Sequence, residues 1–210
     1  MRIVIVQFVV VALVAAGVLA TPTRADAGFA AVEFTPAGAG GNAGDFVTGY
    51  QFQVTAPQVV SALGYYDHLG DGLAESHDVG LYTDAGTLLA SVTVSNANAL
   101  VGNFRYQSIT PLLLSVGTYR VAGAGSVDLF VFNAPGLTSA PGISYLTPAS
   151  SSGATLQFPL FLGGATDGFF GGNLLVDPVA AAVATPLPPT LLAGFLGMGL
   201  LAGVRRFRRA

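Results

Sequence analysis

Short segments in which apolar and polar residues alternate recur along the middle of this chain, and they constrain its fold more than any other feature. In residues 47–54, Tyr50, Phe52 and Val54 alternate with glutamines; in residues 86–94, Leu88, Ala90, Val92 and Val94 fall on one face. A period of two residues is that of a β-strand, because successive side chains of a strand point to opposite faces. Residues 28–178 contain no stretch with the 3.6-residue period of a helix. The body of the chain is therefore predicted to be all-β.

Glycine, asparagine, serine and proline separate these segments and mark turns between strands. Asp84-Ala85-Gly86 predicts a hairpin whose arms are residues 79–83 and 86–94. The full set of predicted strands is 47–54, 59–66, 79–83, 86–94, 104–109, 118–122, 127–132 and 156–162. Short strands at regular spacing are typical of antiparallel sandwiches. We therefore predict one domain over residues 28–178, a jelly-roll-like antiparallel β-sandwich.

The N-terminal end has the composition of a secretory signal. Met1-Arg2 is a short basic start, residues 3–20 form an apolar run, and small residues follow at Ala25 and Ala27. This order is typical of a signal peptide, so we predict that residues 1–27 are removed by cleavage after Ala27. Cleavage after Ala20 and an uncleaved membrane anchor are the alternatives. In each case the segment that follows is exported.

The C-terminal end combines three features in order. Residues 179–190 form a linker with the motif Pro186-Leu187-Pro188, residues 191–204 are uncharged and apolar, and residues 205–210 are basic. The arginines of this tail are Arg205, Arg206, Arg208 and Arg209. Such clusters stay cytoplasmic, which places the body outside the inner membrane. The predicted transmembrane helix of 14 residues is shorter than the ~20 needed for a comfortable span, and this favours a temporary sorting signal over a permanent anchor.

This tripartite end resembles the PEP-CTERM sorting signal of exopolysaccharide-producing Gram-negative bacteria, with Pro186-Leu187-Pro188 in place of the usual Pro-Glu-Pro. The resemblance implies recognition by an exosortase, a membrane protease-transpeptidase that removes the tail. It also implies a protein that is transiently anchored in the membrane and then delivered to the cell surface or to the exopolysaccharide matrix of a biofilm. An ordinary C-terminal membrane anchor is the alternative.

The body carries a second resemblance. Its motifs include Tyr50-Gln51-Phe52, residues 62–67 (Ala-Leu-Gly-Tyr-Tyr-Asp), residues 77–82 (His-Asp-Val-Gly-Leu-Tyr) and Gly117-Thr118-Tyr119-Arg120-Val121. The body thus resembles a β-sandwich family of unknown function that is often found with the same sorting signal. The resemblance implies no catalytic residues.

Charge and composition restrict the classes of function. Residues 28–183 carry ten acidic and two basic side chains, a net charge of −8. A domain this acidic repels polyanions, so nucleic acid is not an expected partner. There is no cysteine and no Gly-x-Ser-x-Gly motif to supply a nucleophile, and we expect no catalytic role. Two alternatives stay open: a carbohydrate-binding module that uses tyrosine faces, and a polysaccharide hydrolase that uses two of the carboxylates.

Residues 67–78 form the densest polar cluster. Asp67, Asp71, Glu75 and Asp78 fall at positions one, five, nine and twelve of a calcium-loop template, although Leu69 occupies position three and no helices flank the segment. The pattern predicts a weak Ca²⁺ site; the alternative is that these acids cap turns in the loop. His68 and His77 lack the further ligands that zinc requires and are expected to be structural.

Overall fold

The computed structural model describes residues 28–35, 41–163 and 168–179. The predicted signal peptide with its cleavage site at Ala27, the motif Pro186-Leu187-Pro188, the apolar segment 191–204 and the arginine tail 205–210 lie outside the described residues. Within the part of the chain that the structure describes, no helix has the length and the apolar character needed to cross a membrane.

The described residues form β-strands and one 3₁₀ turn, and they contain no α-helix, which confirms the all-β prediction. The elements are β1 (Phe29–Ala30), β2 (Val32–Glu33), β3 (Gly41–Asn42), β4 (Phe46–Val54), β5 (Gln58–Tyr66), η1 (His68–Gly70), β6 (His77–Thr83), β7 (Leu88–Val94), β8 (Ala99–Val101), β9 (Phe104–Leu114), β10 (Gly117–Gly125), β11 (Phe130–Phe132), β12 (Thr138–Ser139), β13 (Ile143–Ser152), β14 (Phe161–Leu162), β15 (Phe169–Phe170) and β16 (Gly172–Pro178).

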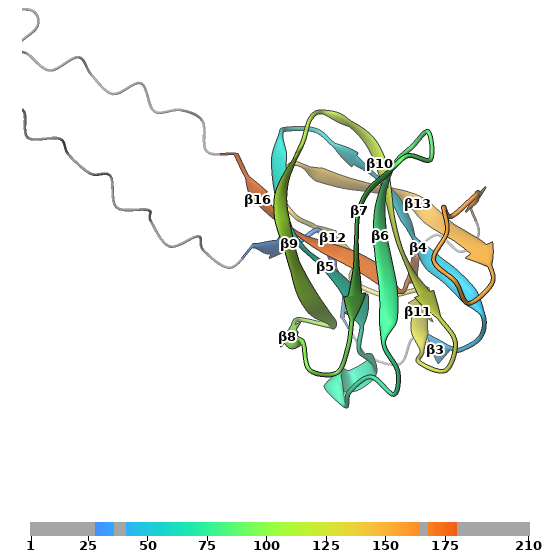
Figure 1. Ribbon diagram of the computed structural model, residues 1–210. Helices are drawn as coiled ribbons and strands as arrows, with labels where there is room; N and C mark the ends of the chain where they lie inside the picture. The colour runs from blue at the N-terminus through green and yellow to red at the C-terminus, as the bar shows by residue number, and fades with distance from the viewer. Residues whose placement is uncertain (1–27, 36–40, 164–167, 180–210) are drawn as a thin grey trace, which may run out of the picture.

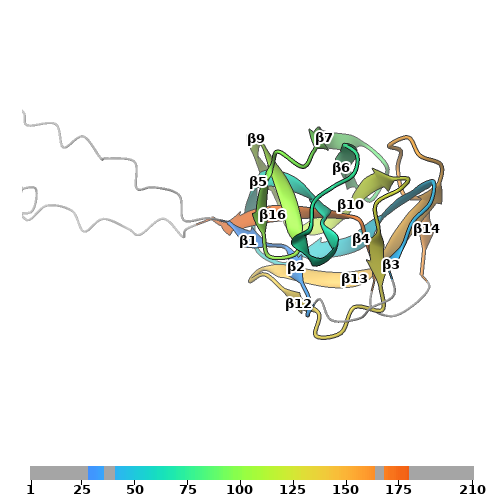
Figure 2. The same cartoon turned by 90° about the horizontal axis from the view of Figure 1, so that it is seen from below.

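Two large sheets make up the body, and every strand pair in them is antiparallel. One has the order β14-β13-β4-β10-β6-β7 and the other β1-β16-β5-β9-β8. Two smaller sheets accompany them, a three-stranded one with the order β15-β11-β3 and the two-stranded β12-β2. Figure 2 shows the two large sheets facing each other across the core, and Figure 1 shows the described ends in β1 and β16 on the same side of the body. The arrangement is that of an antiparallel β-sandwich, as predicted.

The alternation in β4 explains how the core forms. Tyr50, Phe52 and Val54 are fully buried, whereas Gln53 between them is exposed. These side chains pack in the same cluster as Val60 and Leu174 of the opposite sheet. Burial of apolar surface of this kind is the main force that holds two sheets together.

Buried tyrosines need partners for their hydroxyl groups, and Asn173 of β16 supplies them. Its Oδ1 accepts a hydrogen bond from Tyr50 Oη at 2.7 Å, and its Nδ2 donates to Tyr106 Oη at 3.0 Å and to the Val32 carbonyl at 2.8 Å. Burial raises the pKa of Tyr50 and of Tyr106 well above the usual value, so both hydroxyls stay protonated. The asparagine therefore joins β4, β9 and β2 through one satisfied polar group.

The two sheets touch main chain to main chain at Gly172. A Cβ atom at this position would lie 2.6–2.8 Å from main-chain atoms of Ala122 and Gly123 in β10. Only glycine fits such an approach. The contact leaves Tyr65, the register partner of Gly172, over Gly123 at the end of the sandwich that carries the pocket described below.

Two of the predicted strands are shorter than expected. Of residues 156–162 only β14 (161–162) is a strand, because the carbonyl of Pro159 accepts from Arg120 and the amide of Leu160 donates to Ser151 instead of to a neighbouring strand. Of residues 127–132 only β11 (130–132) is a strand, since residues 127–129 line the pocket.

Candidate functional site

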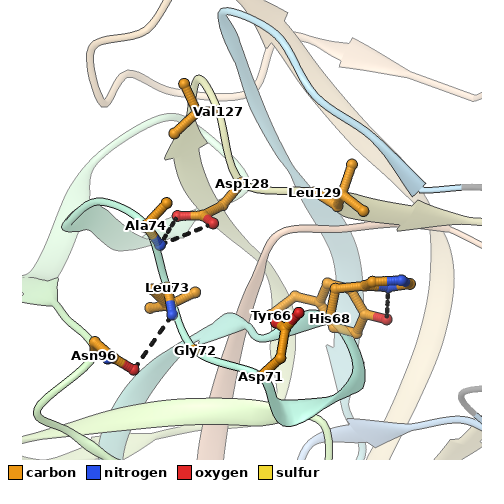
Figure 3. A pocket seen from close by; sticks show the side chains of 10 residues that line it. All are labelled: Tyr66, His68, Asp71, Gly72, Leu73, Ala74, Asn96, Val127, Asp128 and Leu129. Atoms are coloured by element: carbon orange, nitrogen blue, oxygen red, sulfur yellow. Dashed lines mark hydrogen bonds between the residues drawn. The ribbon is translucent and has the colours of Figure 1, made fainter.

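A pocket of about 390 Å³ opens at the end of the sandwich opposite the turn between β4 and β5. Three connections form its walls: the β5–β6 loop, the β7–β8 loop and the β10–β11 loop (Figure 3). The lining residues are Tyr66, His68, Asp71, Gly72, Leu73, Ala74, Asn96, Val127, Asp128 and Leu129. The lining combines the polar side chains of Asp71, Asp128, His68 and Asn96 with the apolar side chains of Leu73, Val127 and Leu129, so the pocket is a mixed surface and not a carboxylate cluster.

Asp67 holds the β5–β6 loop, which forms one wall of the pocket, in position. Its carboxylate is fully buried, accepts the amide of Gly72 at 3.0 Å, and pairs with Arg105 Nε at 2.6 Å. Arg105 also donates through Nη1 to the carbonyls of Asn96 and Asn98, both at 2.9 Å. One ion pair therefore ties the β5–β6 loop, the β7–β8 loop and β9 together. Asp67 thus satisfies loop backbone, which was the alternative to calcium binding.

Asp128 and Glu75 join the remaining walls by reciprocal hydrogen bonds. The Asp128 carboxylate accepts from the amides of Ala74 (3.0 Å) and Glu75 (3.1 Å), and Glu75 Oε1 accepts from the amide of Val127 at 3.2 Å. Burial alone would raise the pKa of Asp128, but the Ala74 amide, the His77 ring and the Glu75 amide together hold it below its usual value. The carboxylate is thus fully used in binding the two loops to each other.

His77 of β6 lies beneath this junction and is 1% exposed. Its Nε2 is 2.7 Å from Asp128 Oδ2, its Nδ1 is 2.9 Å from the carbonyl oxygen of Ala124, and its ring stacks on Tyr65 at 3.7 Å with an angle of 5° between the planes. Both ring nitrogens lie within hydrogen-bond distance of oxygen atoms of the fold, so neither is left for a ligand or a substrate. The geometry therefore makes His77 part of the fold, in agreement with its expected structural role.

Three polar groups of the pocket remain available to a ligand. Asn96 accepts the Leu73 amide through Oδ1 at 3.3 Å, which leaves its Nδ2 hydrogens. His68 Nδ1 shares a hydrogen bond of 3.1 Å with Tyr66 Oη, which leaves its Nε2. Asp71 lies beside Tyr66 (Figure 3), and among the described residues no hydrogen bond engages its exposed carboxylate.

Tyr66 forms the inner wall and stays neutral. Burial, followed by the negative charges of Asp67, Asp71 and Glu33, raises its pKa to about 12. The pocket therefore presents a carboxylate acceptor, an amide donor and an imidazole nitrogen around a surface made by Leu73, Val127 and Leu129.

The four acids of the predicted calcium site occupy separate places. Asp67 is in its ion pair, Glu75 accepts from Val127, Asp71 borders the pocket, and Asp78 on β6 accepts from Thr93 Oγ1 at 2.6 Å. Among the described residues, no three His, Asp or Glu side chains are grouped so that they could hold a metal ion. The structure does not bring these four together as a ligand set, and Ca²⁺ binding stays a prediction.

Sequence reasoning missed Arg105, Asn96 and Asp128 as parts of this site. Asp128 lies 54 residues from Ala74 along the chain, and no local motif links the two. The one hint in the sequence was that basic residues are rare in the body, where Arg105 is one of two.

Comparison with known proteins gives one match. A family model described as a domain of unknown function (DUF4082) matches residues 32–129, a range that includes every residue lining the pocket. This agrees with a body of the unknown-function class that the motifs suggested. No curated protein and no solved structure matches the chain.

Proposed function

We propose that this protein is an exported domain of the cell surface or extracellular matrix that acts by binding and not by catalysis. The observation that carries the proposal is the state of the His77–Asp128 pair, in which a histidine and a carboxylate are 2.7 Å apart. Both nitrogens of His77 and both oxygens of Asp128 are engaged with the fold, and the ring is buried. A general base needs a free lone pair within reach of substrate, and this pair offers none.

The proposed route to the surface rests on the two ends of the chain. Export would use residues 1–27 with cleavage after Ala27, and an exosortase would recognise Pro186-Leu187-Pro188 ahead of residues 191–204 and the arginine tail. The fold is compatible with this route, because β1 and β16 pair antiparallel, with Phe29 opposite Val176. The two described ends thus leave the body on the same side.

Intact mass and fractionation test the route. The protein is isolated from the producing bacterium and from an otherwise identical strain that lacks the exosortase. The proposal expects the terminal arginines to be absent in the first strain and present in the second, with the body outside the inner membrane in both. A tail that persists in both strains would identify a plain membrane anchor instead.

A second candidate function is carbohydrate binding at the pocket. The Asp71 carboxylate, the Asn96 Nδ2 group and the His68 Nε2 atom have no hydrogen-bond partner among the described residues, and they are placed around an apolar wall. Sugar hydroxyls need such mixed groups, and apolar side chains pack on the sugar ring. The acids near the pocket (Asp67, Asp71, Glu75, Asp128) favour neutral or amine-bearing glycans over acidic ones.

A glycan array with the full-length protein in detergent tests this second candidate. Asp71→Ala and Asn96→Ala are each expected to weaken binding about tenfold, as loss of a hydrogen bond to a charged or well-placed group does. Asp78→Ala is the matched control, because Asp78 is an exposed acid on β6 outside the pocket. Equal binding by all variants refutes the pocket as the site.

The same preparation tests for catalysis. Turnover of the cell's own exopolysaccharide by the wild type, lost in Asp71→Asn, would replace the binding proposal by a hydrolase. Binding without turnover supports the non-catalytic function.

A further inference from the structure

Three consecutive apolar side chains stand in solvent at one edge of the six-stranded sheet. Leu160, Phe161 and Leu162 are 67%, 66% and 43% exposed, and residues 161–162 form the edge strand β14. Isolated exposed apolar residues are ordinary, but a contiguous group that includes an aromatic ring marks an interaction surface. We call residues 160–162 the edge knob.

A small apolar cavity lies beside the edge knob. It has a volume of about 200 Å³, and its lining residues are Phe46, Thr48, Phe130, Ser150 and Phe169. Phe130 packs edge-to-face against both Phe46 and Phe169, with ring centroids 6.1 Å apart in each pair. None of the lining side chains carries a charge, and the three rings give the cavity the character of a site for another aromatic or aliphatic group.

The strand register places the knob next to the cavity. Phe161 is directly opposite Ser150 on β13, and Ser150 is directly opposite Thr48 on β4. Directly opposite residues of antiparallel strands have side chains on the same face of the sheet. Phe161 therefore stands on the same face as two residues of the cavity wall, and its exposure means that it does not fill the cavity of its own chain.

Hydrogen bonds hold the knob in position. Ser151 Oγ donates to the Phe158 carbonyl at 3.0 Å and accepts the Leu160 amide at 2.9 Å. Arg120 Nη1 donates to the Pro159 carbonyl at 2.7 Å, while its guanidinium carbon lies 4.5 Å from the centre of the Phe158 ring. A surface that is ordered before binding loses less entropy on association than a loose loop.

We propose that the edge knob and the cavity form the interface between two copies of this chain. In a two-fold arrangement the same patch is used by both partners, so Phe161 of each copy would enter the cavity of the other. A neighbouring knob and hole on one face are the self-complementary pair that such an interface needs.

A knob and a cavity on the same face favour a second copy as the occupant, and the distribution of charge limits where two copies can meet. The described residues carry nine acidic side chains and two arginines, and each arginine is already paired with an aspartate. Two copies therefore repel each other over most of their surface. The cavity lining and residues 158–162 contain no charged side chain, which makes this edge the place where two copies can approach.

Sedimentation equilibrium of the full-length protein in density-matched detergent tests the interface. The wild type is expected to pass from monomer to dimer as its concentration rises, and Phe161→Asp to weaken the association at least about tenfold, as loss of a central aromatic contact does. Leu88→Asp is the matched control, because Leu88 is 49% exposed at the opposite edge of the same sheet. This variant should associate like the wild type.

A pair of complementary variants tests the knob and the hole separately. Phe161→Ala lacks the knob, and Ser150→Phe fills the hole; thermal melting first establishes that both are folded. Each alone is expected to be monomeric, whereas a mixture should form heterodimers, because one knob and one open hole remain between them. A monomeric wild type, equal weakening by Leu88→Asp and Phe161→Asp, or vesicle binding by a monomer through Phe161 would each overturn the proposal.

Discussion

Replacing Asp67 by asparagine tests whether this residue holds the pocket walls or binds a metal. The Asp67 side chain is fully buried and Arg105 is 16% exposed, so the ion pair between them is largely shielded from water. Asparagine keeps the size of the side chain and its bond to the Gly72 amide. It also places a neutral amide against Arg105 Nε, and the guanidinium then lacks its counter-charge.

Breaking a buried ion pair from one side costs about 3–5 kcal/mol. Because some water reaches Arg105, we take the lower end, about 3 kcal/mol. For a domain of this size each kcal/mol lowers the melting temperature by about 2–4 °C, so Asp67→Asn should melt about 6–12 °C below the wild type. Circular dichroism of the full-length protein during heating measures this shift.

Asp71→Asn is the matched control, since Asp71 is an exposed acid of the same loop. It should change the free energy of unfolding by no more than about 0.5 kcal/mol. Equal shifts for the two variants, or a shift for Asp67→Asn below about 1 kcal/mol, would refute the reasoning from the buried pair. Shifts of both variants that occur only when Ca²⁺ is present would instead support the calcium loop.

Three further predictions follow from the same structure. The pKa of Asp128 is lowered from 3.8 in the folded protein, so its carboxylate stabilises the fold above that pH and loses this contribution as the pH falls through the lowered pKa. In Asp128→Asn the free energy of unfolding, measured by urea titration, should therefore fall less steeply with pH below about pH 4 than in the wild type. An equally steep fall of the free energy of unfolding in the variant and the wild type would contradict this expectation. Gly172→Ala should cost about 3 kcal/mol by overpacking, whereas Gly117→Ala, whose added Cβ meets no atom closer than 3.5 Å, should cost little. Millimolar Ca²⁺ should raise the melting temperature of the wild type but not of Asp71→Ala; no rise in the wild type removes the calcium prediction.

The sequence predicted those strands whose faces differ in polarity. Residues 47–54 and 59–66 alternate or are strongly apolar, and they appear as β4 (46–54) and β5 (58–66). In β7 the predicted face of Ala90, Val92 and Val94 is the more buried one, but Leu88 is exposed. The register shifts between Leu81 and Tyr82 of the partner strand, so Leu89 is an extra residue and Leu88 falls on the other face.

Strands whose two faces do not differ in polarity were not predicted. β13 (Ile143–Ser152) contains a run of small residues and Pro148, which in a sequence indicates a loop more than a strand. It is nevertheless held between β4 and β14, with a bulge between Tyr145 and Thr147. Pairing with neighbours distant in sequence decides such a strand, and local pattern carries little of that information.

In the pocket, too, the local sequence pattern indicated some residues and not those brought in from distant segments. His68, Asp71 and the loop that carries them were evident from the density of polar residues, whereas Asn96 and Asp128 come from distant loops that the sheet topology brings together. A sequence pattern shows which side chains are available, but the partner of each carboxylate is fixed by where the strands place their ends.

The position of β16 in its sheet has a mechanical consequence. β16 lies between β1 and β5, and its seven residues (Gly172–Pro178) run directly into the C-terminal end of the described chain. A pull on that end acts along the strand, so its hydrogen bonds to β5 resist sliding as a group. A pull on the N-terminal end acts first on β1, which has only two residues and therefore few hydrogen bonds to share the load. A tether through the C-terminus is therefore the attachment that lets the domain bear drag without unravelling.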